Sequence, residues 1–421
     1  DETQALLRFL FQTDNALTIP VSGTGSAGME TCLVNLVEPG DEVVVCVNGV
    51  FGTRMSDIVN RIGGKLTRVD APWGRAIDPE DVRKAVQGKG PKVLAVVHAE
   101  TSTGVCQPLE DLAAIARQAG TLFLVDTVTS LGGMEVEVDR IGIDAVYSGT
   151  QKCLSCPPGL APISLSPAAV EVLEKRTVPV VSWYLDMGMV ADYWGGERKY
   201  HHTAPINMIF ALREAVRIIA EEGLAARFAR HRLNHRALVA GIETMGLGMV
   251  VPEAERLPML NTIYIPEGAD DKRVRGALLR GFGMEIGGGL GEFAGKAWRV
   301  GLMGHLASTR TRPELIEFQG MPVGAAVADT RDVGARREPR GAAHRAPVAG
   351  WCSGASEPPC VGRAWTRIVD SACSVLDNGA RLPRIASALE VLLERARDHG
   401  GGWLDSVRGE RPEDLLRSPG A

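Results

Sequence analysis

The stretch Leu122-Phe-Leu-Val-Asp126 is a short apolar run that ends on a carboxylate, and the next such run leads into Tyr147-Ser-Gly-Thr-Gln-Lys152. Short runs that are apolar on both faces are typical of strands in a parallel sheet that helices cover on both sides. From about residue 17 to residue 165, runs of this kind alternate with segments of helical periodicity. The sequence therefore predicts an α/β fold in which Asp126 and Lys152 each follow the end of a strand.

The expected elements divide the chain into two domains. Strands are expected at residues 16–20, 43–47, 65–69, 93–98, 122–125, 145–147, 161–164, 262–265, 284–286 and 297–302. Helices are expected at residues 1–11, 27–36, 52–62, 79–86, 109–119, 209–222, 224–245 and 271–281. Gly223 follows a long amphipathic helix and suits a helix stop. We therefore expect a large domain over residues 1–222, with a mostly parallel sheet covered by helices, and a smaller α+β domain over residues 223–318.

The composition changes after about residue 318. Residues 319–421 contain arginine but no lysine, and residues 322–362 are rich in Ala, Gly, Pro and Arg without periodicity. Such a segment is not expected to pack into a hydrophobic core. Two interpretations stay open: a natural disordered extension, or the product of a reading-frame change. The chain also starts without methionine, inside a helical pattern, so its natural amino terminus is expected to be missing.

Charge and cysteine usage narrow the function classes. A net charge of −5, with basic and acidic residues interspersed, gives no footprint for nucleic acid or an anionic membrane. Small molecules and other copies of the chain are the expected partners. No apolar stretch approaches the roughly 20 residues of a membrane span, and the eight cysteines show no disulfide spacing. A cytoplasmic location is therefore expected. Cys153 and Cys156 have redox or zinc spacing, but no second ligand pair accompanies them, so no metal is expected.

A glycine-rich turn, Val-Ser-Gly-Thr-Gly-Ser-Ala-Gly at residues 21–28, follows a strand and opens a helix. Its backbone N–H groups and the helix dipole suit a phosphate. Gly23, Gly25 and Gly28 also match the dinucleotide pattern G-x-G-x-x-G, but the acid that should end the following strand is absent, since Asn48 stands there. A purely structural turn is the other alternative.

Asp126 and Lys152 together with this turn favour a pyridoxal phosphate enzyme. Such an enzyme needs a lysine that holds the cofactor's aldehyde as a Schiff base and a carboxylate that keeps its pyridine nitrogen protonated. Either residue alone is weak evidence for such an enzyme, because an acid after a strand is often a helix cap and most lysines lie on the surface. Phe51, just past a strand end, could stack on the ring or simply pack.

Six segments, in order along the chain, carry a family resemblance. They are residues 23–30, His-Ala-Glu-Thr-Ser-Thr-Gly (98–104), residues 125–133, Ser-Gly-Thr-Gln-Lys (148–152), Tyr-His-His-Thr (200–203) and Arg-Val-Gly-Leu-Met-Gly (299–304). With these segments the chain resembles the alanine:glyoxylate and serine:glyoxylate (serine:pyruvate) aminotransferases, which are class V, fold-type I pyridoxal phosphate enzymes. The resemblance covers residues 1 to about 310 and implies a homodimer with shared active sites.

The resemblance implies a role for each matching residue. Lys152 would be the Schiff-base lysine and Asp126 the partner of the pyridine nitrogen, while Arg299 would bind the substrate α-carboxylate. The remaining cofactor contacts would be Phe51 on the ring, Thr24, Gly25, Ser26 and Gln151 on the phosphate, Thr101 near the ring oxygen, and Tyr200 and Thr203 on the phosphate of the other subunit. Phe51 departs from the usual tryptophan, and Ser26 from the histidine of many animal relatives.

We therefore expect transamination from alanine or serine to glyoxylate, which would give glycine and pyruvate or hydroxypyruvate. Other class V activities, of the cysteine desulfurase or 2-aminoethylphosphonate transaminase type, stay open. A desulfurase needs a mobile thiol, for which Cys352 and Cys360 in the tail are candidates. The alternative from another class is a truncated, inactive dimerisation or scaffold protein.

Overall fold

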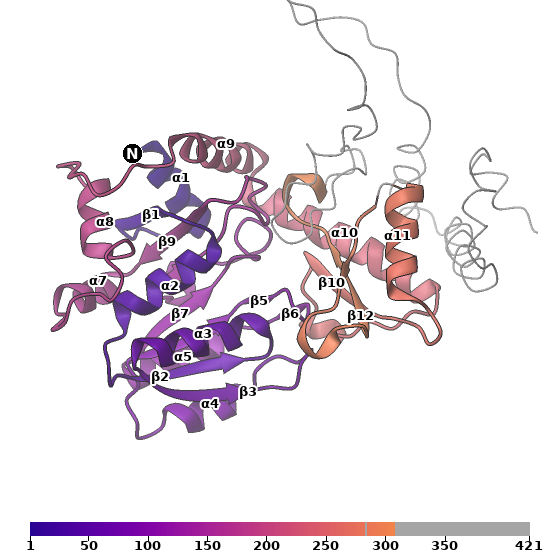
Figure 1. Cartoon of the computed structure of the whole chain (residues 1–421), viewed down its shortest axis with the longest axis horizontal. Coiled ribbons are helices and arrows are strands. Elements are labelled where there is room, and N and C mark those ends of the chain that lie inside the picture. The colour runs from indigo at the N-terminus through magenta and orange to yellow at the C-terminus, as the bar shows by residue number, and fades with distance from the viewer. Residues whose placement is uncertain (283, 308–421) are drawn as a thin grey trace, which may run out of the picture.

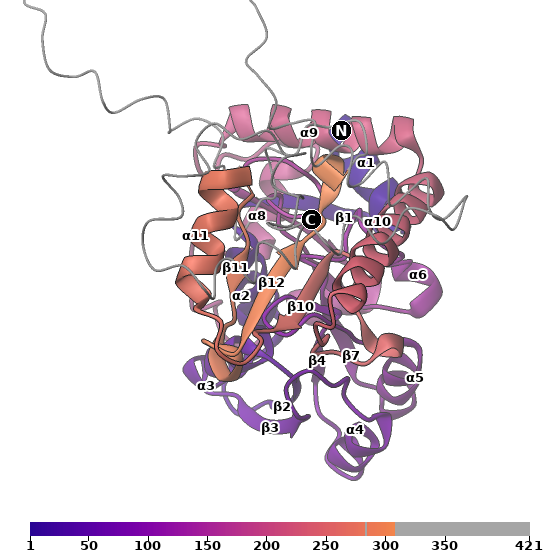
Figure 2. The ribbon, with the colours of Figure 1, turned by 90° about the vertical axis from the view of Figure 1, so that its right-hand side faces the viewer.

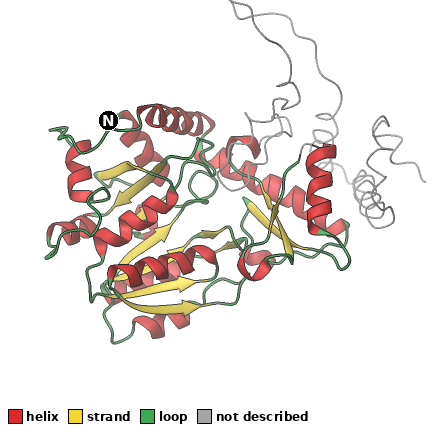
Figure 3. Ribbon diagram, viewed as in Figure 1, coloured by secondary structure: helices red, strands yellow, loops and turns green. Residues whose placement is uncertain are grey.

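The computed structural model describes residues 1–282 and 284–307 of the chain. A central sheet organises the larger part of these residues (Figures 1 and 3). Its strands are β1 (Leu17–Ser22), β2 (Glu42–Val47), β3 (Lys65–Asp70), β4 (Val93–Val97), β7 (Leu122–Asp126), β8 (Ala145–Tyr147) and β9 (Leu160–Leu165). Their spatial order is β1-β9-β8-β7-β4-β2-β3.

Strand direction decides which loops meet at each edge of this sheet. Strands β8, β7, β4, β2 and β3 are parallel, whereas β9 runs antiparallel to both β8 and β1. Because two antiparallel pairings restore the original direction, β1 points the same way as β8. The loops that leave β1, β4, β7 and β8 therefore start from the same edge of the sheet.

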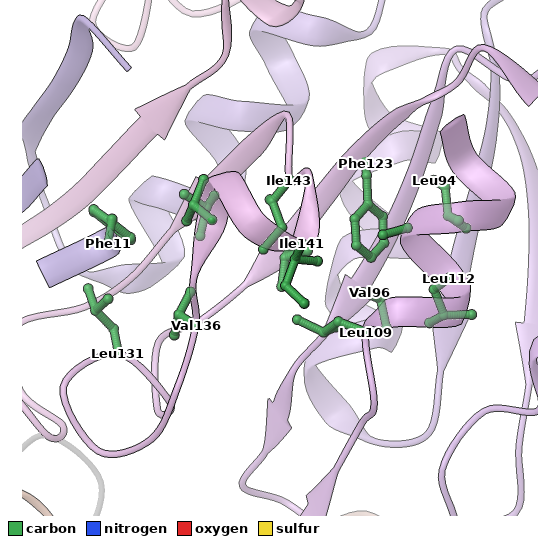
Figure 4. Close-up of a cluster of buried hydrophobic side chains, with 14 of the residues drawn as sticks. Phe11, Leu94, Val96, Leu109, Leu112, Phe123, Leu131, Val136, Ile141 and Ile143 are labelled. Atoms are coloured by element: carbon green, nitrogen blue, oxygen red, sulfur yellow. The ribbon is translucent and has the colours of Figure 1, made fainter. Parts of the chain in front are cut away.

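Helices cover both faces of the sheet, and a separate hydrophobic cluster lies under each layer. The first layer contains α1 (Glu2–Phe11), α4 (Pro79–Val86), α5 (Glu110–Ala119), the short α6 (Val138–Ile141) and α9 (Ile206–Glu222). Figure 4 shows part of its cluster, where Leu112 and Phe123 lie between helix and sheet. The second layer contains α2 (Gly25–Leu36), α3 (Val50–Ile62), α7 (Pro167–Glu174) and α8 (Met187–Trp194).

Local signals explain several helix ends. The Asp78 side chain accepts a hydrogen bond from the Glu80 N–H and Pro79 opens α4, while the Ser166 side chain caps α7 ahead of Pro167. Gly120 ends α5 with φ 65°, a left-handed conformation that glycine adopts without strain.

A second unit follows α9; it lies to the right of the larger one in Figure 1 and faces the viewer in Figure 2. Helix α10 (Leu224–Thr244) leads into a three-stranded sheet of order β10-β12-β11, packed with α11 (Asp271–Phe282). The strands are β10 (Leu260–Tyr264), β11 (Gly287–Gly288) and β12 (Ala297–Gly301), and short 3₁₀ turns lie at Glu253–Glu255, Gly291–Phe293 and Gly304–Ala307. We propose the division into domains after residue 222, where Gly223 (φ 81°) separates α9 from α10.

The structure confirms the expected α/β class, a mostly parallel sheet with helices on both faces, and corrects several details. The strand expected at residues 284–286 is displaced to Gly287–Gly288, where the backbone pairs with Arg299 and Trp298. Strand β3 lies at the sheet edge with mostly exposed or half-buried residues, since it has β2 alone as a neighbour. The hairpin of β5 (Ala99–Glu100) with β6 (Val105–Cys106), and helices α6, α7 and α8, were not expected. The atypical tail predicted at residues 319–421 lies entirely outside the described residues, as do residues 308–318 of the expected small domain.

Within the described part of the chain, no helix is both long enough and apolar enough to cross a membrane.

Candidate active site

Three loops converge at the carboxyl edge of the sheet, after β1, β7 and β8. A Cβ placed on Gly149, in the loop after β8, would lie 3.3 Å from the Gly25 Cα and 2.8 Å from the Gln151 Oε1. A Cβ on Gly25, at the start of α2, would lie 2.9 Å from a methyl carbon of Val128, in the loop after β7. A side chain at Gly25 would therefore crowd Val128, and one at Gly149 would crowd Gln151 and the Gly25 backbone, so glycine lets these loops lie close together.

The first of these loops also needs an unusual backbone. Gly23 has φ 146°, and a Cβ there would lie 2.5 Å from the Ala27 Cβ. The turn closes with hydrogen bonds from the N–H groups of Ala27 and Gly28 to the Thr24 carbonyl. As a result, Gly25 and Ser26 occupy the first turn of α2, where backbone N–H groups of a helix suit an anion.

Asp126 is the last residue of β7, and it is 3% exposed. The Tyr147 hydroxyl donates to its Oδ2 at 2.6 Å, and the Val128 N–H donates to its Oδ1 at 2.8 Å. Burial raises the pKa of Asp126 to about 6, and these two hydrogen bonds oppose that rise. Tyr147 was missed by the sequence analysis, yet register places it beside Asp126 across the β7–β8 pair.

Lys152 lies five residues beyond β8 and is buried to 9% exposure. Its loop is fixed on the neighbouring strand: the Thr150 N–H donates to the Leu160 carbonyl, and the Ser155 N–H donates to the Lys152 carbonyl at 3.0 Å. Gln151 points its Oε1 toward Gly149, and this oxygen is buried without a hydrogen-bond partner. Gln151 and Gly25 thus both lie against Gly149, which places Gln151 beside the glycine turn of residues 23–26.

Phe51 stands in the first turn of α3, and a distant acid holds that turn. Glu100 is fully buried; its Oε2 accepts from the Phe51 N–H at 3.1 Å, and its Oε1 accepts from both the N–H and the hydroxyl of Ser102. The Ser102 hydroxyl in turn accepts from the Val50 N–H at 3.0 Å. Burial raises the pKa of Glu100, and these donors oppose that rise. Glu100 and Ser102 therefore act as the cap that α3 lacks locally, since Gly49 has no side chain.

Arg299 comes to the same region from the small domain. It lies in β12 and is 3% exposed, and its guanidinium donates from Nε to the Gly288 carbonyl at 2.8 Å and from Nη1 to the Thr101 carbonyl at 3.0 Å. Burial lowers the pKa of Arg299 to about 10, and the nearby Glu100 opposes that change. Thr101 and Arg299, which the sequence placed in one site, are in direct contact.

Tyr200 and Thr203 behave differently from the other expected residues. Tyr200 is 75% exposed, and its hydroxyl lies 3.5 Å from the Thr203 hydroxyl. His202 lies between these two residues in the sequence, and its Nε2 is 2.7 Å from the hydroxyl of Ser22, at the end of β1. The segment thus passes the glycine turn while Tyr200 points into solvent.

The cysteines beside Lys152 carry no sign of redox or metal chemistry. Cys153 and Cys156 are buried in different hydrophobic clusters, and burial raises their thiol pKa values to about 11 and about 12. Within residues 1–282 and 284–307, no group of three or more His, Cys, Asp or Glu side chains is arranged to hold a metal ion.

Comparison with known proteins agrees with this geometry. Residues 1–289 match the family model described as aminotransferase class-V. The chain is 40% identical to a (S)-ureidoglycine–glyoxylate transaminase of Bacillus subtilis (72% of this chain, 78% of that protein) and 39% identical to an alanine–glyoxylate aminotransferase of Drosophila melanogaster (73% and 79%). A crystal structure of an alanine–glyoxylate aminotransferase from Nostoc sp. superposes with a TM-score of 0.72 at 51% identity, over 73% of this chain and 82% of that one. The chain therefore belongs to the class V aminotransferases.

Proposed function

We propose that the protein transfers the amino group of alanine or serine to glyoxylate, with pyridoxal phosphate bound at the carboxyl edge of the central sheet. The observation that carries the proposal is the buried Asp126 at the end of β7, on the same edge as the glycine turn of residues 23–26. Class V aminotransferases as a family depend on this cofactor. The relatives named for glyoxylate support it as the acceptor.

The residues present fit pyridoxal phosphate. A cationic ring nitrogen beside Asp126 would stabilise the ionised carboxylate that burial now disfavours. The buried side-chain amide of Gln151 has an oxygen without a partner, and either end of an amide can face a ligand. The close approach of Gly25 and Gly149 keeps side chains out of the space where a phosphate would meet the start of α2.

Each residue then has a chemical task. Bound pyridoxal phosphate supplies an aldehyde that takes the amino group and a ring that accepts electrons. Lys152 provides the amine that holds the aldehyde and, once displaced by substrate, moves the proton at the substrate Cα. Asp126 keeps the proton on the ring nitrogen, and Phe51 stacks on the ring. Arg299 orients the substrate carboxylate.

Phosphate and ring contacts complete the proposed site. Thr24, Gly25, Ser26 and Gln151 contact the phosphate, and Thr101 lies near the ring oxygen. Tyr200 and Thr203 reach the phosphate of a partner subunit in a homodimer. The exposure of Tyr200 supports this role, as do further exposed apolar side chains nearby in the chain: Val178, Val181, Trp183, Tyr184, Met189, Ile206 and Phe210.

The desulfurase alternative has less support. Four of the five cysteines in the described residues are buried and Cys106 is half-buried, so none offers a mobile thiol there. Cys352 and Cys360 lie outside the described residues. A solved cysteine desulfurase that resembles this chain is 18% identical and shows the fold alone. The cytoplasmic location stays a prediction.

Lys152→Ala is the direct test. The purified wild-type chain, incubated with pyridoxal phosphate, should gain a visible absorbance band and a cofactor adduct on Lys152 that borohydride fixes for mass spectrometry. The variant should lose both, whereas Lys175→Ala, an exposed lysine paired with Glu171, should keep them. Half-reaction rates with alanine, serine, ureidoglycine and 2-aminoethylphosphonate, followed by glyoxylate, then identify the donor. An adduct on another lysine, or no adduct in the wild type, would refute the assignment.

A further inference from the structure

The glycine turn that we assign to the phosphate carries no positive charge of its own. Residues 22–27 are Ser-Gly-Thr-Gly-Ser-Ala, and Gln151 is neutral. A phosphate monoester carries about −1.5 to −2 charges at neutral pH, so a helix amino terminus alone leaves most of that charge uncompensated. Lys152 does not fill this gap, because its amine is assigned to the cofactor's aldehyde.

Arg54 brings a cation to this turn from the neighbouring helix. It stands three residues after Phe51 in α3, so the two side chains share one face of the helix. The Arg54 guanidinium carbon lies 5.2 Å from the centre of the Phe51 ring, and Nη1 donates to the Ser26 hydroxyl at 2.9 Å. The guanidinium thus lies between the aromatic assigned to the ring and the serine assigned to the phosphate.

The charge of Arg54 also reaches the centre of the site. Its positive charge lowers the pKa of Asp126, although burial has the larger and opposite effect. No carboxylate within residues 1–282 and 284–307 forms an ion pair with Arg54, so its charge is available to an anion. The other arginine of α3, Arg61, is instead paired with Asp57 on the exposed side of the helix.

We propose that Arg54 supplies the positive charge that holds the cofactor's phosphate, with the Phe51 ring and the Ser26 hydroxyl fixing the guanidinium. This inference rests on the proposed function, since it concerns the same cofactor. It assigns the phosphate's counter-charge to α3 of the same subunit, and it makes α3 contact both the ring, through Phe51, and the phosphate, through Arg54.

The test compares two ligands that differ by the phosphate alone. Dissociation constants of pyridoxal phosphate and of pyridoxal are measured for the cofactor-free wild type, Arg54→Gln, Arg54→Lys and the control Arg61→Gln. A lost charge-assisted hydrogen bond at a partly solvated site should weaken pyridoxal phosphate binding by about tenfold or more in Arg54→Gln, and by less in Arg54→Lys. Pyridoxal binding should not change, and Arg61→Gln should match the wild type with both ligands.

A second readout uses inorganic phosphate alone. Phosphate should raise the unfolding temperature of the cofactor-free wild type and of Arg61→Gln, and it should raise that of Arg54→Gln less. Equal weakening of both ligands in Arg54→Gln would mean that Arg54 only shapes the loop, and this overturns the inference while Lys152 keeps its role. A wild type that binds neither ligand at Lys152 overturns the proposed function as well.

Discussion

Replacing Asp126 by asparagine should stabilise the cofactor-free protein while it weakens cofactor binding. Asp126 is buried, and its pKa rises from the ordinary 3.8 to about 6. The folded protein therefore holds this proton more tightly than the unfolded chain does. Asparagine has nearly the same shape and can still accept from the Val128 N–H, but it cannot ionise.

The size of the effect follows from the two pKa values. Because folding raises the pKa of Asp126, the protonated carboxyl stabilises the folded protein. This stability is fully present below about pH 3.8, the pKa in the unfolded chain, and it is lost as the pH rises through about 6, the pKa in the folded protein. The gap of about 2.2 corresponds to about 3 kcal/mol at 1.36 kcal/mol per pKa unit. The variant should thus exceed the wild type in free energy of unfolding by about 3 kcal/mol near pH 8, and by roughly half of that near pH 5.

The assay is urea unfolding of cofactor-free wild type and Asp126→Asn between about pH 5 and pH 8, followed by fluorescence. Asp57→Asn, an exposed acid paired with Arg61, serves as control and should show no offset that grows over this range. With pyridoxal phosphate added, the order should reverse, because the cofactor stabilises the wild type more strongly. An offset between Asp126→Asn and wild type that stays constant from pH 5 to pH 8, or that has the opposite sign, would refute the argument from burial.

Two further predictions concern the substrate and the partner subunit. Arg299→Ala should raise the KM for the amino donor on the order of a hundredfold, because a buried carboxylate–guanidinium pair is lost, and it should leave the cofactor's absorbance unchanged. Steady-state kinetics measure this KM, and an unchanged KM would remove Arg299 from the substrate site. In a shared-site homodimer, mixing inactive Lys152→Ala and Tyr200→Ala chains should restore about a quarter of wild-type activity, because half of the dimers are then mixed and each mixed dimer has one intact site of two. If activity does not recover after mixing, Tyr200 acts in the active site of its own subunit.

Much of the architecture could be predicted from local sequence. Strands such as β2 and β4 are continuous apolar runs, and helices α4 and α5 carry their own start and stop signals in Asp78, Pro79 and Gly120. These features act within a few residues, so a single sequence displays them. Helices α7 and α8 begin at the capping residues Ser166 and Asp186 but are only 8 residues long, and β5 and β6 have two residues each. Elements this short depend on packing against the rest of the fold, so their local signals do not predict them.

The site divides in the same way. The order of the glycine turn, Asp126 and Lys152 along the sequence indicated the chemistry, because each follows a strand or opens a helix. The contacts that tune these residues cross long stretches of sequence: Tyr147 meets Asp126, Glu100 holds the Phe51 turn, and Arg299 reaches the Thr101 carbonyl.

The sequence by itself thus determined the fold class, the family resemblance and the identity of the candidate groups, since these depend on residue type and spacing. Tertiary structure alone decided the protonation and placement of those groups. Burial of Asp126, the antiparallel insertion of β9 that brings the β1 and β8 loops to one edge, and the approach of Arg54 to Ser26 all arise from contacts between distant segments. A pattern of residue types carries no information on solvent exclusion or on the distance between such segments, and these two quantities set the charges in the site.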